Sequence, residues 1–94
     1  MKAKYQLAPS VHMVSDQDGA VLLDRSRGLV YGLNATAGVI LRGISSGRNV
    51  DQIEGDVRQM FSDIHGEPHA DIVALIERLV DAGLLLRSPG DAHT

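Results

Sequence analysis

The sequence predicts an α+β protein in which a three-stranded antiparallel sheet is followed by three helices. Apolar runs of strand length come first, separated by glycine-ended turns, and after Asn34 the apolar residues recur at helical spacing. The chain has 94 residues, 44% of them hydrophobic and 22% charged, which is typical of one folded domain. We expect a flexible N-terminus over residues 1–9, a domain over residues 10–87 and a flexible tail over residues 88–94.

The three predicted strands are short and are joined by tight turns. Residues 11–15 alternate loosely, residues 20–24 form an apolar run, and residues 29–33 are apolar on both faces. Gly19 and Gly28 end the two intervening turns, where a residue able to adopt positive φ is favoured. An antiparallel meander is the simplest arrangement of such runs.

Each predicted helix has a recognisable start. Asn34 stands at an N-cap position, Asn49 and Gln52 have the spacing of a capping box, and Pro68 suits the first turn of the third helix. Gly83 fits the left-handed residue that ends this helix, with the next leucine folding back on the last turn. The apolar stripes are Ala37, Ile40, Leu41 and Ile44; Val50, Ile53, Val57, Met60, Phe61 and Ile64; and Ile72, Leu75, Ile76, Leu79 and Val80.

Composition excludes several classes of protein. The chain has no cysteine, so disulfide scaffolds, thiolate metal sites and cysteine nucleophiles are excluded. The N-terminus lacks the apolar run of a signal peptide, and no segment approaches the roughly 20 apolar residues of a membrane span. We therefore expect a cytoplasmic protein with no membrane partner.

No catalytic or metal-binding constellation stands out. The serines lie in turns, near element ends or on polar faces, and the ten glycines are scattered singly, so neither a nucleophile elbow nor a phosphate loop is indicated. His65 and His69 are four residues apart, but Gly66 and Pro68 lie between them and no helix fixes their geometry. We expect a protein that is not an enzyme and holds no metal or cofactor.

DNA binding is the alternative that the predicted architecture raises. Three helices with a small sheet suggest a winged-helix-like fold, which commonly places a helix in the major groove. The third helix offers Arg78 against Asp71, Glu77 and Asp81, and the formal net charge of the chain is -3. Phosphates would repel such a helix, so a DNA-binding regulator is the less favoured interpretation and we expect no nucleic-acid partner.

Residues 29–33 leave two interpretations open, because this run is apolar on both faces. It fits a fully buried strand. It also fits an open strand edge beside an apolar groove, which could accept an extended peptide as an added strand.

Three stretches resemble the PqqD-like family: residues 21–24 with 28–37, residues 49–53, and residues 70–85. They contain a Leu-Asn-x-Thr-type junction after the third strand and a Gly-Leu-Leu end after the third helix. The resemblance implies a winged-helix-like, non-catalytic recognition element of ribosomally made, modified peptides. The Leu-Leu-Asp and Gly-x-x-Tyr strings look most like the stand-alone leader-binding proteins of lasso-peptide pathways. A chaperone for pyrroloquinoline quinone synthesis or another radical-SAM peptide modification is the alternative within the family.

The resemblance also implies partners and a site. The leader of a precursor peptide would add to the third strand beside the third helix, and the domain would deliver it to a separate leader peptidase or modifying enzyme. The residues expected to bind the peptide are Leu29, Val30, Tyr31, Gly32 and Leu33 on the strand, with Val73, Ile76, Glu77 and Val80 on the helix.

Overall fold

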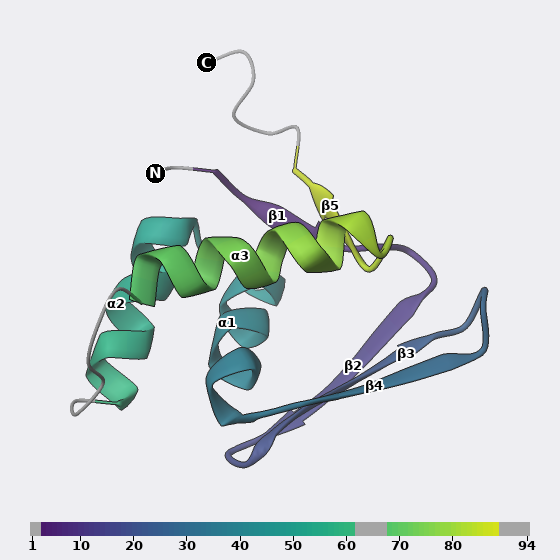
Figure 1. Cartoon of the computed structure of the whole chain (residues 1–94), viewed down its shortest axis with the longest axis horizontal. Coiled ribbons are helices and arrows are strands. Elements are labelled where there is room, and N and C mark those ends of the chain that lie inside the picture. Colours follow the sequence, from purple (N-terminus) through teal and green to yellow (C-terminus); the bar gives the residue numbers. More distant parts are fainter. Residues whose placement is uncertain (1–2, 62–67, 89–94) are drawn as a thin grey trace.

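A computed structural model describes residues 3–61 and 68–88 and confirms the predicted α+β architecture. Three strands run into three helices, and a short two-stranded ribbon joins the two ends of the domain (Figure 1). The elements are β1 (Tyr5–Leu7), β2 (Val11–Asp16), β3 (Gly19–Asp24), β4 (Leu29–Leu33), α1 (Ala35–Ser45), α2 (Val50–Met60), α3 (Pro68–Asp81) and β5 (Leu85–Arg87).

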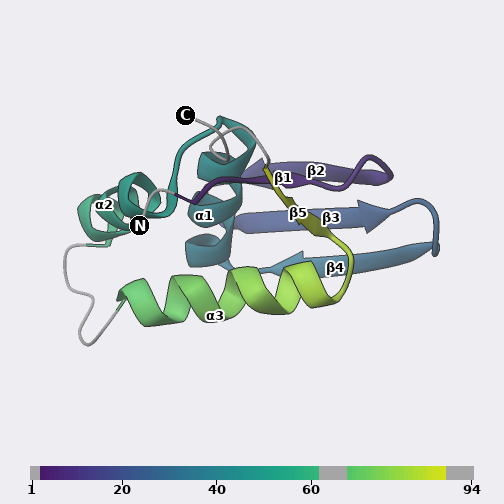
Figure 2. The same ribbon diagram turned by 90° about the horizontal axis from the view of Figure 1, so that it is seen from above.

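The larger sheet is the predicted antiparallel meander, in the order β2-β3-β4. Figure 2 shows its strands side by side, with α3 next after β4. Opposite residues of antiparallel strands share a face, so Tyr31 lies on the same face as its fully buried partner Leu22. Val30 pairs with Leu23 on the other face, where both side chains are exposed.

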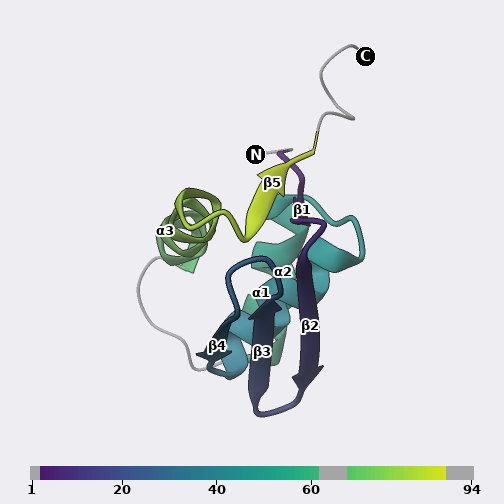
Figure 3. The same cartoon turned by 90° about the vertical axis from the view of Figure 1, so that its right-hand side faces the viewer.

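The expected flexible N-terminus over residues 1–9 is wrong for residues 5–7. Strand β1 pairs with β5 (Figure 3), and Tyr5 is only 7% exposed. Neither strand was predicted, because three residues are too few to show a period of two. The ribbon forms because the Schellman turn after α3 returns the chain beside its own beginning. In that turn Gly83 has φ +79°, and Leu84 N–H donates to the Leu79 carbonyl.

The predicted caps of α1 and α2 are confirmed. The Asn34 side chain accepts a hydrogen bond from Ala37 N–H, which satisfies one of the orphan donors of the first turn. Asn49 and Gln52 form the reciprocal capping box, with both bonds at 2.9 Å. α2 ends at Met60, earlier than its apolar stripe suggested. The predicted positions Ile64 and His65 lie outside the described residues.

The core lies where α1 meets the sheet and the other two helices. A Cβ on Gly43 would lie 2.7 Å from Cγ1 of Ile53, so glycine sets the close approach of α1 and α2. The largest fully buried side chains are Leu22, Leu41, Ile44, Val50, Ile53, Val57, Ile72, Ile76, Leu84 and Leu85. Among the described residues, no helix is both long and apolar enough to cross a membrane.

Candidate functional site

Strand β4 is an edge strand, and its free edge carries backbone groups that no described strand pairs with. In an antiparallel ladder, alternate residues direct both N–H and C=O to the same neighbour. Arg25 N–H donates to the Ser10 carbonyl, so the register leaves the backbone groups of Val30 and Gly32 on the free edge. The residues of β4 that face β3 are Leu29, Tyr31 and Leu33. The strand therefore offers an unused ladder, the usual template for strand addition.

A groove of about 670 Å³ lies beside this edge, between the end of β4 with the start of α1 on one side and α3 on the other. Its apolar lining includes buried side chains from all three helices, and its polar rim includes Asp71 and Arg78 of α3. The residues that line it are Gly32, Leu33, Asn34, Thr36, Ala37, Ile40, Val57, Pro68, Asp71, Ile72, Leu75 and Arg78. An apolar hollow next to unused backbone groups is suited to an extended peptide.

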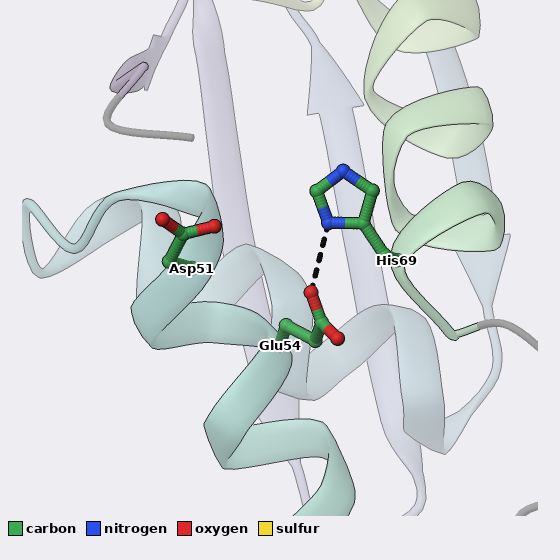
Figure 4. A group of neighbouring side chains, drawn as sticks. All are labelled: Asp51, Glu54 and His69. Atoms are coloured by element: carbon green, nitrogen blue, oxygen red, sulfur yellow. Dashed lines mark hydrogen bonds and ion pairs between the residues drawn. The ribbon is translucent and has the colours of Figure 1, made fainter.

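Polar contacts hold both ends of α3. At the C-terminal end, the guanidinium of Arg27, from the turn between β3 and β4, donates to the Ala82 carbonyl. At the N-terminal end, Nδ1 of His69 lies 2.8 Å from Oε1 of Glu54 on α2 (Figure 4). The helix is thus fixed to its neighbours at its two ends, and the groove runs between these contacts.

Glu54 is the centre of the contact between α2 and α3. Its Oε2 accepts a hydrogen bond from Nη2 of Arg58 at 2.8 Å, while its Oε1 faces His69. The Arg58 hydrogen bond, and after it the His69 contact, hold the pKa of the Glu54 carboxyl below its ordinary value. The carboxylate is therefore charged at neutral pH and joins the two helices.

Asp51 completes a group with Glu54 and His69 whose ligand atoms all lie within 4.8 Å of one another (Figure 4). In the sequence, His69 and His65 are the pair considered as possible metal ligands, and His65 lies outside the described residues. A divalent cation would compete with Arg58 for the Glu54 carboxylate, because cations at one carboxylate repel each other. This group therefore joins α2 to α3 through the contact between Glu54 and His69.

Asp24 organises the turn that leads into β4. It is 2% exposed and accepts hydrogen bonds from the hydroxyl and N–H of Ser26 and from Arg27 N–H. The Ser26 hydroxyl is the main cause that lowers the pKa of the Asp24 carboxyl, with the Arg27 N–H also contributing. Because the same Arg27 reaches Ala82, this aspartate helps set where β4 begins relative to α3.

Of the five predicted strand residues, Gly32 and Leu33 line the groove. Leu29 and Val30 are 46% and 66% exposed, and Gly32 is exposed as well. Tyr31 and Leu33 are half-buried on the core face of the sheet. Of the two interpretations of residues 29–33, the structure supports the open edge, because a fully buried strand would expose none of these side chains.

The four residues predicted on α3 do not line the groove. Ile76 is 1% exposed and belongs to the core, and Val73 is half-buried against it. Glu77 and Val80 border a separate hollow of about 290 Å³ with Tyr5 and Arg87. The stripe Ile72-Ile76-Leu79 points into the core, so either flank of it could have faced β4. No physical reason in the residue pattern favours one flank over the other, and the groove lies on the flank of Asp71, Leu75 and Arg78.

A family model described as "Coenzyme PQQ synthesis protein D (PqqD)" matches residues 19–85, from the first residue of β3 to the first residue of β5. The chain belongs to the PqqD family. This match spans the edge strand, the three helices and the groove between β4 and α3. No curated protein matches the chain.

Two solved structures resemble the chain over most of its length. One, described as "Lasso peptide synthetase B1 complexed with the leader peptide", is 27% identical with a TM-score of 0.72, over 88% of this chain and 98% of that one. The other, "TbiB1 in Complex with the TbiA(beta) Leader Peptide", is 19% identical with a TM-score of 0.70, over 85% of this chain and 93% of that one. The second likeness concerns the fold alone.

Proposed function

We propose that this protein is a non-catalytic recognition domain that captures the leader segment of a precursor peptide as an added strand on β4. The observation that carries the proposal is the free edge of β4 opening onto the groove beside α3. The PqqD family membership supports it, as does the 27% identical structure that was solved with a leader peptide.

Backbone hydrogen bonds would supply the part of the affinity that does not depend on the sequence of the peptide. Val30 and Gly32 each offer one N–H and one C=O, and a typical hydrogen bond contributes about 1 kcal/mol net. Apolar peptide side chains that enter the groove would add about 25 cal/mol for each Å² they bury. Together these terms favour an extended peptide with apolar residues at alternate positions.

The proposed contact residues are those of β4, Leu29–Leu33, together with the groove-lining residues of α3. The latter replace the four helix positions expected from the sequence. The proposed domain also includes β1 and β5, because they close the end of the core on which α3 rests.

The chemistry on a bound peptide would belong to a separate enzyme. Within residues 3–61 and 68–88, no serine or histidine forms a nucleophile–base pair, and His69 is engaged with Glu54. We propose that the domain acts in the cytoplasm and delivers its peptide to a leader peptidase or modifying enzyme of the lasso-peptide type.

Two variants of Gly32 test the mechanism. A Cβ at this position would meet no atom within 4 Å, so Gly32→Ala has space, and circular dichroism confirms that Gly32→Pro is folded. Gly32→Ala keeps the edge N–H, whereas Gly32→Pro removes it from the side of the strand that faces away from β3.

The probe is a displayed library of short random peptides selected on the wild-type protein, with affinities of the enriched peptides measured by fluorescence anisotropy. We expect enriched peptides to bind Gly32→Ala as they bind the wild type, and Gly32→Pro about tenfold more weakly or worse, since a backbone bond is lost and the ring obstructs the partner strand. Enrichment of no peptide, or equal affinity for both variants, would refute strand addition to β4.

A further inference from the structure

The groove has a charged residue of α3 towards each end of one wall. Asp71 lies in the first turn of the helix and Arg78 two turns later, and both line the groove with exposed side chains. Within the part of the chain that the structure describes, neither side chain has a hydrogen bond or ion pair. The helix dipole accounts for the sign of each charge, because acids favour the N-terminus and bases the C-terminus. It does not account for their common position on the groove.

The direction of α3 relative to β4 gives these charges an order. The end of β4, at Leu33, borders the groove together with Pro68 and Asp71 at the start of α3. Just before the start of β4, Arg27 contacts Ala82 at the other end of α3. Figure 2 shows the same opposite directions for the strand and the helix.

A peptide added antiparallel to β4 would therefore run in the same direction as α3. All described pairs in the larger sheet are antiparallel, and an antiparallel addition continues this pattern. The N-terminal part of the peptide would pass Asp71 first, and its C-terminal part would then pass Arg78.

The spacing of the two charges sets a spacing in the peptide. Seven residues of helix at 1.5 Å each separate Asp71 from Arg78 by about 10 Å. An extended chain covers that distance in about three residues at 3.4 Å each. Because only alternate side chains of a strand face the same way, the side chains that reach the two charges are two or four residues apart.

We propose that this groove reads the order of charge in its peptide: a basic side chain comes first and an acidic one follows two or four residues later. The inference rests on the proposed function. It deepens it by assigning Asp71 and Arg78 as specificity-determining residues, which fix the direction and the register of the bound strand while the backbone ladder supplies affinity common to many sequences.

The test uses one host peptide enriched on the wild-type protein, with Lys and Glu introduced at positions two and four residues apart. Each pair is made in both orders, so that the two isomers have the same composition and charge. We expect the Lys-first isomer to bind about tenfold more tightly at low salt at the best-placed pair, because two favourable rim pairs replace two repulsive ones. The preference should disappear near 1 M salt, where the screening length is about 3 Å.

Three protein variants test which residues cause the preference. Asp71→Arg combined with Arg78→Asp conserves the net charge, and we expect it to reverse the preferred order. The single variants Asp71→Arg and Glu77→Arg change the net charge equally, but Glu77 borders the hollow on the other flank of α3. We expect Asp71→Arg to weaken the preference and Glu77→Arg to leave it unchanged. Circular dichroism confirms that each variant is folded.

The outcomes separate the two proposals. Equal binding of the isomers, or a preference for the Glu-first isomer by the wild type, overturns the charge order and leaves strand addition intact. A preference that the double variant fails to reverse shows that other residues set it, which also overturns the assignment. If the unmodified host peptide binds Gly32→Pro as it binds the wild type, strand addition itself fails.

Discussion

The two flanks of α3 are built from similar residues but are arranged differently. On one flank, Val73 packs on the core, and Glu77 and Val80 border Tyr5 and Arg87 of the β1–β5 ribbon. On the other flank, Asp71, Leu75 and Arg78 face the groove beside β4. Each flank has aliphatic and charged side chains, so composition does not distinguish them.

The two flanks differ in the hydrogen bonding of the strand next to each of them. The ribbon flank meets β5, which is bonded to β1, and Arg87 lies 5.7 Å from the centre of the Tyr5 ring. The groove flank meets β4, whose outer edge is unpaired. We therefore expect the ribbon flank to carry stability and the groove flank to carry binding.

The largest expected effect is on the ribbon flank. Tyr5→Ala removes a 7% exposed aromatic side chain, and we expect a loss of about 3 kcal/mol in the free energy of unfolding, equivalent to about 15 °C in Tm. Thermal and urea denaturation measure it. Leu86→Ala is the matched control in the same ribbon, where the side chain is 41% exposed and we expect a loss below about 0.5 kcal/mol.

Peptide binding by Tyr5→Ala sharpens the comparison. We expect the folded variant to bind a selected peptide with the wild-type Kd at a temperature well below its Tm. A large change in Kd with little change in stability would show that the roles of the two flanks are reversed.

A smaller effect is expected on the groove flank. Leu75→Gln keeps the helix propensity and the length of the side chain but removes an apolar contact surface, and we expect the peptide Kd to rise about tenfold, or about 1.4 kcal/mol. Val80→Gln makes a similar change on the other flank, where the side chain is 37% exposed, and should alter Kd by no more than about twofold. Isothermal titration calorimetry measures both. Equal effects of the two substitutions would contradict a groove on one flank only.

A third prediction concerns Asp24, which positions the turn before β4. Its pKa is lower in the folded protein than its ordinary value, so its contribution to stability is present above the unfolded pKa and is lost as the pH falls through the folded pKa. We expect the urea concentration at the unfolding midpoint of the wild type to decrease as the pH is lowered from 6 into the acidic range. The midpoint of Asp24→Asn should decrease less over the same change of pH. Asp18→Asn, in the exposed turn between β2 and β3, is the control and should keep the wild-type pH dependence. If Asp24→Asn had the same pH dependence of stability as the wild type, the proposed contribution of the Asp24 carboxylate would be contradicted.

Local signals were sufficient to predict most of the fold. The strands β2, β3 and β4 have glycine-ended turns, and the helices α1 and α2 have side-chain caps whose hydrogen bonds the structure contains. These signals depend on residues close together in the chain. The pairing of β1 with β5 depends instead on contacts between residues about 80 positions apart, such as Tyr5 with Arg87, and no local pattern encodes it.

The open edge strand could be predicted from the sequence, but the flank of α3 that faces the groove could not. Leu29–Leu33 was identifiable because its double apolar pattern is unusual for a strand with one face on the core. The stripe Ile72-Ile76-Leu79 has apolar neighbours on both flanks, Leu75 on one and Val80 on the other. Which flank faces β4 depends on how α3 is held at its two ends by Arg27 and Glu54, both distant in sequence.

Amide hydrogen exchange of the free and peptide-bound protein tests strand addition most directly. The amides of Val30 and Gly32 lie on the free edge, so a bound strand should slow their exchange in proportion to the occupied fraction of the site. The amides of Tyr5 to Leu7 and of Leu85 to Arg87, in the ribbon on the other flank, should exchange as in the free protein. Protection that appears in the ribbon while Val30 and Gly32 stay unchanged would contradict the account.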